Sequence, residues 1–394
     1  MIPPQDRKRI PRKFLDADAG DVPPPQSTPA RAVELGPPTT RRLVVGCMTG
    51  TSLDGLDAAL VAIEGHGLAL RPSLVATHSV ELGTLGPQLR ALAEQVPMSA
   101  GAIARLNADF AALHAAAITT LLAGRRANLI SVHGQTVYHA PPISWQLFNP
   151  APLARALGTP VVCDLRAADL AAGGQGAPLT PLADLVLFGH QRERRVIANL
   201  GGFCNLTRIG PGRDPARVVG RDLCACNQVL DGLARSVLGQ AFDQGGEVAL
   251  VGRVRPAPFK TLVALLSGQG ADGRSLGTGD ELQAWLSRTR KIPAADLART
   301  ACAAVAQVLA TAAAGADRLV LAGGGVRNRA LVAELGERAG MPVQASDTLG
   351  VPAAYREAMA WAVLGALCQD RVPITLPQVT GVASAPIAGM WVLP

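Results

Sequence analysis

Aromatic side chains are scarce in this sequence. Phe, Tyr and Trp together make up 3% of its 394 residues, so the core must be built from Ala, Leu and Val. The formal charge of +7 at pH 7 raises the question of nucleic-acid binding. Base stacking needs aromatic side chains, and the basic residues are dispersed along the chain, so we expect no nucleic-acid partner. An anionic small-molecule substrate is enough to explain the charge.

Paired cysteines are also absent. An odd, scattered set without a Cys-x-x-Cys pair is typical of reduced thiols and predicts a cytoplasmic protein. Several cysteines lie in apolar runs, where a small buried residue is the expected role. Cys224 and Cys226, without a nearby His or a further Cys, do not make a metal site. The seven cysteines are Cys47, Cys163, Cys204, Cys224, Cys226, Cys302 and Cys368.

Long apolar runs are missing as well. No uninterrupted apolar run reaches the ~20 residues that a membrane span requires, so we expect no membrane partner. Residues 1–42 contain Pro-Pro and Pro-Pro-Pro clusters and the basic run Arg7-Lys8-Arg9. Such a segment cannot bury enough surface to fold, and it lacks the apolar region of a secretory signal. We therefore predict a disordered tail at residues 1–42.

The length and the hydrophobic content indicate a folded chain with more than one core. Hydrophobic residues make up 48% and charged residues 17%, and 394 residues exceed what one core usually supports, which favours two lobes. Strands and helices alternate in two cycles, which predicts parallel strand pairing with ligand groups gathered at strand ends. The predicted strands are 43–45, 56–63, 129–132, 160–163, 196–200 and 318–322, and the predicted helices are 98–123, 152–157, 227–238 and 294–314.

The segment from Arg42 to Ile63 contains two predicted strands joined by a glycine-rich polar turn. Glycines let backbone N–H groups approach an anion, hydroxyls add donors, and Asp54 could hold Mg²⁺ through water. No Gly-Lys-Ser/Thr follows, so this is not a Walker loop. An ordinary hairpin turn is the alternative to a phosphate site. The residues that would cradle phosphate are Gly50, Thr51, Ser52, Leu53, Asp54, Gly55, Leu56 and Asp57.

Eight short blocks follow one another along the chain. The first, Gly46 to Asp57, reads Gly-Cys-Met-Thr-Gly-Thr-Ser-Leu-Asp-Gly-Leu-Asp. The others lie at 131–139, 164–169, 173–181, 199–205, 323–328, 357–361 and 379–381. In order and spacing these blocks resemble the anhydro-N-acetylmuramic acid kinases, a branch of the sugar kinase, Hsp70 and actin superfamily.

The resemblance implies an α/β fold of two ribonuclease-H-like lobes around a nucleotide cleft. Lobe I would span residues 43–194, with a C-terminal segment of about 355–394 packing back on it, and lobe II residues 195–354. The implied activity is an ATP-dependent, Mg²⁺-requiring kinase that hydrolytically opens 1,6-anhydro-N-acetylmuramic acid and phosphorylates it at O6. The product, N-acetylmuramic acid 6-phosphate, would enter peptidoglycan recycling. Enzymes of this type are often homodimers.

The resemblance also implies roles for residues of the second half. Asp222 would be the general base that activates water. A glycine turn follows the predicted strand 318–322, and its bare backbone can pack flat against a base or ribose. The resemblance assigns this turn to adenosine, and a purely structural strand-to-helix turn is the alternative. The implied nucleotide residues are Gly201, Gly202, Gly323, Gly324, Gly325 and Asn328.

The sugar side is expected in the first half and near the C-terminus. His133 and Gln135 could hydrogen-bond sugar hydroxyls, although a histidine satisfied inside the fold is an alternative. Arg166 could bind a lactyl carboxylate through a bidentate fork, and Asp164 or Asp169 could order that arginine or the metal; a structural ion pair is the alternative. Glu357 opens an apolar helix and is unusual for a core position, and the resemblance likewise places a glutamate near the sugar there.

The segment around Asp222 departs from the family pattern Phe-Asp-Thr-Gly-Pro-Gly-Asn. It reads Arg221-Asp-Leu-Cys-Ala-Cys-Asn227. Leu223 lacks the hydroxyl of threonine, and Cys224 and Cys226 place side chains where a ligand can need bare backbone. The alternative function is therefore a catalytically impaired family member that acts as a ligand-binding or regulatory protein.

Overall fold

The computed structural model describes residues 41–50, 53, 55–269, 280–289 and 291–394, without the side chains of 280–283. These residues belong to one compact unit, Pro38–Pro394. The predicted tail lies outside the described residues except for its last two. Arg41 and Arg42 belong to the first strand, which corrects the tail boundary. The Arg42 side chain is only 5% exposed. Its guanidinium donates hydrogen bonds to Asp370 Oδ2 at 2.6 Å and to Gln369 Oε1 at 2.8 Å.

The first sheet has six strands in the order β13-β7-β4-β1-β2-β3. The first three strands along the chain form an antiparallel meander, and β4 and β7 continue the sheet in parallel from β1. Strand β13 closes the edge antiparallel to β7, although it comes from the C-terminal end of the chain. The strands are β1 (Arg41–Thr49), β2 (Gly55–Glu64), β3 (Arg71–Glu81), β4 (Leu129–Val132), β7 (Val161–Cys163) and β13 (Met390–Val392).

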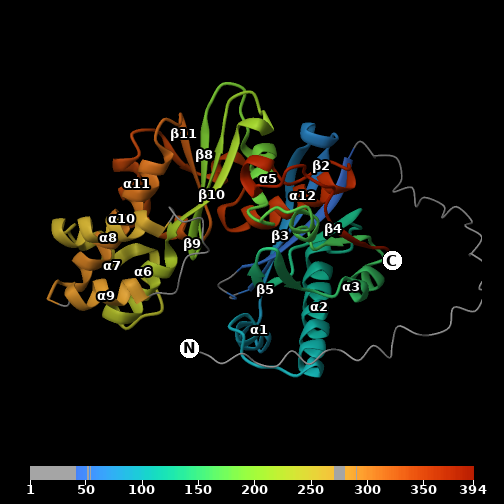
Figure 1. Cartoon of the computed structure of the whole chain (residues 1–394), viewed down its shortest axis with the longest axis horizontal. Helices are drawn as coiled ribbons and strands as arrows, with labels where there is room; N and C mark the ends of the chain where they lie inside the picture. Colours follow the sequence, from blue (N-terminus) through green and yellow to red (C-terminus); the bar gives the residue numbers. More distant parts are fainter. Residues whose placement is uncertain (1–40, 51–52, 54, 270–279, 290) are drawn as a thin grey trace, which may run out of the picture. The chain divides into compact units, whose positions relative to one another are not determined.

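The second sheet has five strands in the order β10-β9-β8-β11-β12. Four of them, β8, β9, β10 and β11, are labelled in Figure 1. The sheet repeats the pattern of the first: an antiparallel meander, then two strands that continue in parallel from the first strand of the meander. The repeated order confirms the predicted α/β fold of two ribonuclease-H-like sheets and the predicted parallel pairing. The strands are β8 (Arg195–Leu200), β9 (Phe203–Ile209), β10 (Val218–Ala225), β11 (Arg318–Ala322) and β12 (Val343–Ala345).

Helices accompany both sheets, and a two-stranded hairpin follows β4. The hairpin is β5 (Gln135–Ala140) and β6 (Ile143–Leu147). The helices between the first strands and β8 are α1 (Leu85–Ala93), α2 (Ala100–Leu122), α3 (Pro150–Leu157), α4 (Ala167–Ala171) and α5 (Thr180–Phe188). The later helices are α6 (Asn227–Leu233), α7 (Glu247–Val251), α8 (Pro256–Gln269), α9 (Asp280–Thr289), α10 (Ala294–Ala313), α11 (Arg329–Arg338), α12 (Arg356–Gln369) and α13 (Pro377–Thr380). All four predicted helices are present. The bounds of three differ from the prediction by at most two residues, whereas the third ends at Leu233, because Ala234–Leu238 forms a π turn.

The α12 helix packs closely on the first sheet, and two glycines permit the approach. A Cβ on Gly46 of β1 would lie 2.0 Å from the Ala358 carbonyl oxygen, and one on Gly365 of α12 would lie 2.5 Å from Ser131 Cβ. Residues of both sheets and of α5 and α12 share one buried cluster, which includes Val44 and Ile197. Helix α12 therefore belongs to the core that joins the sheets.

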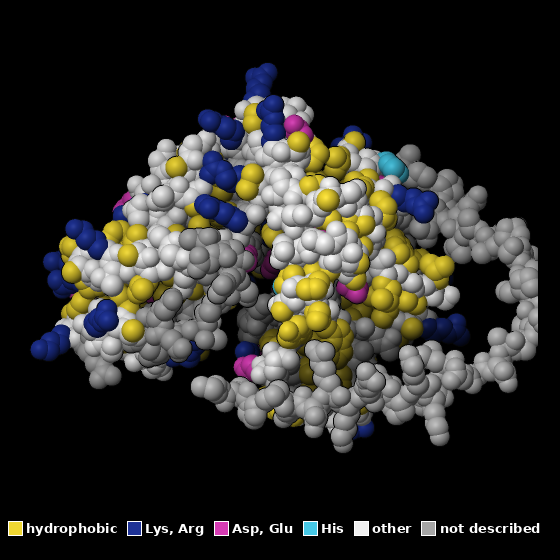
Figure 2. Space-filling model, viewed as in Figure 1, with side chains coloured by type: hydrophobic (Ala, Val, Ile, Leu, Met, Phe, Trp, Pro, Cys, Tyr) yellow, Lys and Arg dark blue, Asp and Glu magenta, His cyan; other side chains and the backbone are white. Residues whose placement is uncertain are grey.

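The cysteines and the charged surface agree with the composition. All seven cysteines are buried and free, as the apolar sequence context predicts. The described residues contain no group of three or more His, Cys, Asp or Glu that could hold a metal ion. Basic side chains on the visible face lie in several separate groups (Figure 2). No helix in the described part of the chain is long and apolar enough to cross a membrane.

Candidate active site

Asp222 lies on β10, opposite Asn205 of β9, and its side chain is exposed. The next paired residue of β10 is Cys224, opposite Cys204, so Leu223 is an extra residue in a β-bulge. In a regular strand, residues 222 and 224 would face the same side, because side chains alternate with a period of two. The bulge breaks that alternation, so the carboxylate faces solvent while Cys224 enters the core.

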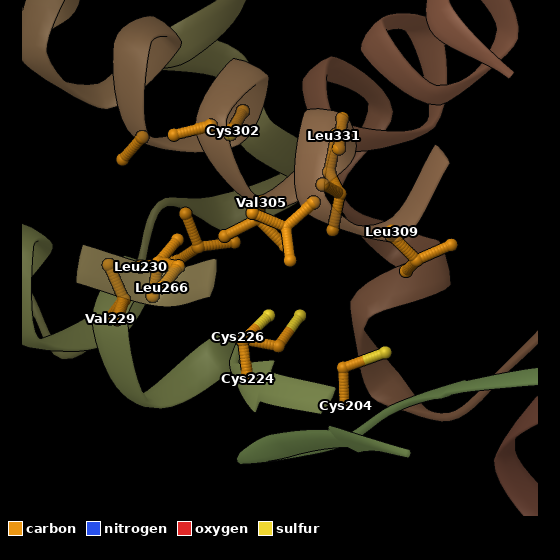
Figure 3. Packing of buried hydrophobic residues seen from close by; sticks show 14 of the residues in the cluster. Cys204, Cys224, Cys226, Val229, Leu230, Leu266, Cys302, Val305, Leu309 and Leu331 are labelled. Carbon is orange, nitrogen blue, oxygen red and sulfur yellow. The ribbon is translucent and has the colours of Figure 1, made fainter. Parts of the chain in front are cut away.

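The thiols that replace glycines in this segment are core side chains. Cys224 and Cys226 are both 0% exposed and pack with Val305 and Leu309 of α10. Figure 3 shows their sulfur atoms beside that of Cys204 in this packing layer. Burial raises the pKa of Cys224 to about 12, so the thiol stays neutral. These side chains therefore do not occupy the solvent side on which Asp222 stands, contrary to the position that the sequence suggested.

Arg166 lies at the start of α4, and its position is fixed by two contacts. Nη1 donates to the Gly176 carbonyl at 3.1 Å, and Nη2 lies 3.1 Å from His133 Nε2. His133 Nδ1 lies 2.8 Å from the Gly134 carbonyl, so it donates there and leaves Nε2 to accept from Arg166. Burial, and then the charge of Arg166, lower the pKa of His133 to about 3, so the imidazole is neutral. Both nitrogens of His133 are thus engaged within the protein.

Three carboxylates from different segments interact electrostatically with Arg166. Burial lowers its pKa to about 10, and Asp222, Asp164 and Glu357 act in the opposite direction. Partial loss of hydration among its neighbours raises the pKa of Asp222, although its side chain reaches solvent, and the positive charge of Arg166 opposes that rise. Asp164, at a positive φ of 48°, also has a pKa raised by burial. The structure therefore brings the predicted base and the predicted sugar-binding arginine together, although they follow strands of different sheets.

Asp169 does not share that exposed setting. It is 0% exposed, and its carboxylate accepts hydrogen bonds from Gly176 N at 2.7 Å and Thr380 Oγ1 at 2.9 Å. Both oxygens are therefore used inside the fold. The carbonyl of Gly176 is also the acceptor for Arg166. Asp169 therefore orders the arginine indirectly, by holding the backbone of Gly176.

Glu357 lies half-buried in the first turn of α12. Burial raises the pKa of its carboxyl group, while Arg356 and a hydrogen bond with the Asn199 side chain oppose that rise. Asp57 of β2 is close enough to repel this carboxylate. Asp57 itself accepts a hydrogen bond of 2.5 Å from Ser79. The sequence analysis did not predict Asn199, near the end of β8, as a site residue; its only sequence signal is its position just before Gly201 and Gly202.

The two glycine turns of the second sheet meet at the ends of parallel strands. Gly201 and Gly202 follow β8, and Gly323, with φ +83°, follows β11. A Cβ on Gly323 would lie 2.7 Å from Asn199 Oδ1, so only glycine allows this contact. Gly325 is equally close-packed, whereas Gly324 is exposed with only Asn227 Nδ2 near its Cβ direction, at 3.9 Å.

Other predicted nucleotide residues have structural partners. The Asn328 side chain caps α11 by accepting from Leu331 N at 3.0 Å. The carbonyl of Gly202 accepts from the N–H groups of Cys226 and Gln228, and that of Gly201 from Asn227, at the start of α6. Gly201, Gly202, Gly323 and Gly324 themselves present only backbone, as a close approach to a nucleotide would need.

The first glycine turn is described in part. Leu53 is 7% exposed and Leu56 is 0% exposed, so both side chains belong to the core and only their backbone could face a ligand. The amide of Leu53 donates to the Gly50 carbonyl at 3.2 Å, and Gly55 opens β2. The predicted phosphate and metal residues Thr51, Ser52 and Asp54 lie outside the described residues.

Several buried polar atoms around these segments have no hydrogen-bond partner among the described residues. They include Thr49 Oγ1, Gln135 Oε1, Arg166 Nε and Asn199 Oδ1. Buried polar atoms are nearly always hydrogen-bonded, so each of these is suited to a ligand group or a water molecule. Gln135 is 2% exposed and donates only to the Thr136 carbonyl, which leaves its carbonyl oxygen available.

Comparison with known proteins assigns the chain to a narrow group. Residues 42–393 match the family described as "Anhydro-N-acetylmuramic acid kinase". A protein of that name from Bordetella petrii is 38% identical over 381 residues, covering 89% of this chain and 96% of the relative. One from Synechococcus sp. is 35% identical over 384 residues, covering 89% and 99%. Among solved structures, the (R)-2-hydroxyglutaryl-CoA dehydratase component A of Acidaminococcus fermentans has a TM-score of 0.46 at 14% identity, covering 83% of this chain and 99% of that chain.

Proposed function

This chain belongs to the anhydro-N-acetylmuramic acid kinase family, and on that premise we propose that it phosphorylates 1,6-anhydro-N-acetylmuramic acid at O6 with ATP while opening the anhydro ring. The product is N-acetylmuramic acid 6-phosphate, for peptidoglycan recycling. The observation that carries the proposal is the exposed carboxylate of Asp222 beside Arg166, on the side of β10 that the thiols leave free.

Asp222 acts as the general base of this reaction. It accepts a proton from water as the water oxygen bonds to the anomeric carbon and the bond from that carbon to O6 breaks. The released O6 bonds to the γ-phosphorus, and the bond from that phosphorus to the bridging oxygen of ADP breaks. Although this carboxylate reaches solvent, neighbouring groups remove part of its hydration, and the raised pKa makes it a stronger base than a fully hydrated aspartate.

Arg166 binds the lactyl carboxylate of the sugar. Its contacts with His133 and Gly176 hold the guanidinium in place, and Nε has no partner among the described residues. A fixed guanidinium loses little side-chain freedom when it binds a carboxylate, and the charge-assisted pair is strong. His133 acts through Arg166, while Gln135 and Glu357 offer acceptors to the sugar hydroxyls.

The glycine turns hold the nucleotide. Gly50 to Asp57 cradles phosphate, and the turn from Gly323 to Asn328, with Gly201 and Gly202, packs on adenosine. The polar side chains of the first turn offer only oxygen donors, the ligands that Mg²⁺ prefers, and Asp54 would hold the ion through water. Bound there, Mg²⁺ would neutralise phosphate charge during transfer.

Two lobes divide this work. We assign residues 41–194 and about 355–394 to a first lobe and 195–354 to a second, with a nucleotide cleft between them. The proposal is supported by the two sheets, by β13 pairing with β7, and by the attraction between Arg166 and Asp222. The full chain would work in the cytoplasm, and a homodimer is compatible with this arrangement.

A coupled ADP-release assay with ATP, Mg²⁺ and the anhydro-sugar tests the function. The full chain should release ADP only when the sugar is present. The Asp222→Asn variant, which keeps the size of the side chain, should lose about 10²–10⁴-fold in kcat, as expected for a lost general base. It should still bind the sugar in calorimetry. If the full chain shows no turnover above Asp222→Asn, the protein is not a kinase of this sugar, and the ligand-binding alternative stands.

A further inference from the structure

A fully buried ion pair lies beside the active site. Arg356, the first residue of α12, is 1% exposed, and Asp184 of α5 is 0% exposed. The guanidinium donates to Asp184 through Nε at 2.8 Å and through Nη2. Asp184 Oδ2 also accepts from Thr207 Oγ1 of β9 at 2.6 Å. The pair thus ties α12 and α5 to the second sheet.

This pair is poorly explained by stability alone. Removing two charges from water costs free energy that their attraction often only just offsets, and apolar side chains of similar size serve as well. The arrangement is also incompletely satisfied, because Arg356 Nη1 has no partner among the described residues. Fixing a position is therefore a better explanation for these two side chains in this core.

The position that the pair fixes is the first turn of α12. The helix as a whole contacts β1, β2 and β4 of the first sheet. In that turn, Arg356 reaches Thr207 of the second sheet through Asp184, and the next residue, Glu357, hydrogen-bonds with Asn199 of the second sheet. Two consecutive residues thus hold the end of a first-sheet helix against the second sheet.

We propose that Arg356, anchored by Asp184, is a positioning residue that fixes the Glu357 carboxylate in the sugar site. The inference rests on the proposed function insofar as Glu357 contacts the sugar. Arg356 does not reach the ligand, because its guanidinium points into the core. Its role is to hold the backbone of the turn and to supply a positive charge next to Glu357.

The charges around Glu357 give this role a measurable signature. Arg356 on α12 attracts the Glu357 carboxylate, whereas Asp184 on α5 and Asp57 on β2 repel it. Arg166, before α4, is a further positive charge within reach of Glu357. Removal of the Arg356 charge should raise the pKa of Glu357. Neutralising Asp184 should lower that pKa, because a repulsive charge is lost and Arg356 is left without its counter-ion.

The experiment compares Arg356→Met and Asp184→Asn in the full chain. Glutamate labelled with carbon-13 at the side-chain carboxyl reports the titration of Glu357 by NMR, with Glu357→Gln assigning the signal. We expect the pKa of Glu357 to shift in opposite directions in the two variants. With anhydro-sugar, Arg356→Met should lower kcat/KM about tenfold or more through a raised sugar KM, with the KM for ATP unchanged, because a displaced contact group weakens alignment.

Two further variants guard against misfolding. The double variant Asp184→Leu with Arg356→Met removes both charges and should fold, because apolar replacement of a buried pair is often neutral. It should still show the raised sugar KM. Arg299→Met is the matched control, since Arg299 Nε pairs with the buried Glu334 at 2.6 Å between α10 and α11. It should lower the unfolding temperature without moving the titration of Glu357.

The outcomes separate the inference from the proposed function. If the Glu357 titration stays unchanged or moves the same way in both variants, while stability falls as in Arg299→Met, the pair is only structural and the inference is wrong. If the full chain does not turn over the anhydro-sugar, the proposed function fails. The NMR titration still decides whether Arg356 controls Glu357.

Discussion

The proposed chemistry depends on the charge of one carboxylate, Asp222. Partial loss of hydration raises the pKa of Asp222, and the charge of Arg166 opposes that rise. A general base must be deprotonated, so kcat/KM should fall with decreasing pH through the pKa of Asp222, which lies above the ordinary value. Arg166→Gln removes the charge that favours the carboxylate, so the acidic limb of the pH profile should move to still higher pH, and the sugar KM should rise.

A pH–rate series for both proteins measures this shift. Arg194→Gln serves as a control, because Arg194 pairs with Asp317 at 2.8 Å on an exposed surface and no contact links it to Asp222. If the acidic limb of the pH–rate profile lies at the same pH in Arg166→Gln as in the unchanged protein, a group other than Asp222 determines that limb.

The thiols beside Asp222 provide a second test at this scale. Cys224 is 0% exposed and packs in the core. Cys224→Ala therefore leaves a small cavity and should lower the free energy of unfolding by about 1 kcal/mol, with kcat unchanged. Urea unfolding and the ADP-release assay measure the two effects. An increase of kcat in this variant would mean that the thiol obstructs the ligand, as the departure from the family pattern suggested.

At the scale of elements, local sequence patterns predicted many of the helices and strands. The helix predicted at 294–314 is observed as Ala294–Ala313, and the strand predicted at 129–132 has those bounds in the structure. Register was not encoded locally. The bulge at Leu223 reverses which side Cys224 faces, and it depends on pairing with β9.

For the predicted site as well, some residues could be identified from the local sequence and others could not. Asp222, Arg166 and Glu357 could be selected as residue types at strand and helix ends, and the structure brings them together. The pair of Asp184 and Arg356 could not be found, because its members are 172 positions apart and each is an ordinary helix residue in sequence. A single sequence also gives no signal that both nitrogens of His133 are engaged inside the fold.

The contact between β1 and α12 leads to a stability prediction. A Cβ at Gly46 would lie 2.0 Å from the Ala358 carbonyl oxygen and 2.4 Å from Ala362 N, both backbone atoms that cannot move alone. Gly46→Ala should therefore destabilise the protein by about 3 kcal/mol or more, or prevent folding. Gly336→Ala is the control, because Gly336 is exposed in α11 with nothing within 4 Å of its Cβ. Equal unfolding midpoints for the two variants would contradict the close packing of α12 on the sheet.

At the scale of the whole molecule, the proposed binding groups come from both sheets. Arg166 follows β7 of the first sheet, whereas Asp222 and the turn at Gly324 belong to the second. On the proposed assignment, sugar and nucleotide would therefore use partly different residues within one folded unit. A ligand that binds only the native state stabilises it by about 2.7 kcal/mol at 100 times its dissociation constant. The sugar alone and the nucleotide alone should therefore each raise the unfolding temperature. A variant that loses one binding site should lose only the shift caused by that ligand.

Two variants make this separation measurable by thermal unfolding. Arg166→Gln should lose the shift caused by the anhydro-sugar and keep the shift caused by a non-hydrolysable ATP analogue with Mg²⁺. Gly324→Val should lose the shift caused by the ATP analogue and keep the shift caused by the sugar. Gly324 is exposed, has no positive φ and has only Asn227 Nδ2 near its Cβ direction, at 3.9 Å. The fold should therefore tolerate the valine side chain, which would block the flat packing of a nucleotide. If Gly324→Val keeps the nucleotide shift, adenosine does not lie on this turn. If Arg166→Gln keeps the sugar shift, the arginine is held by His133 and Gly176 for a structural purpose.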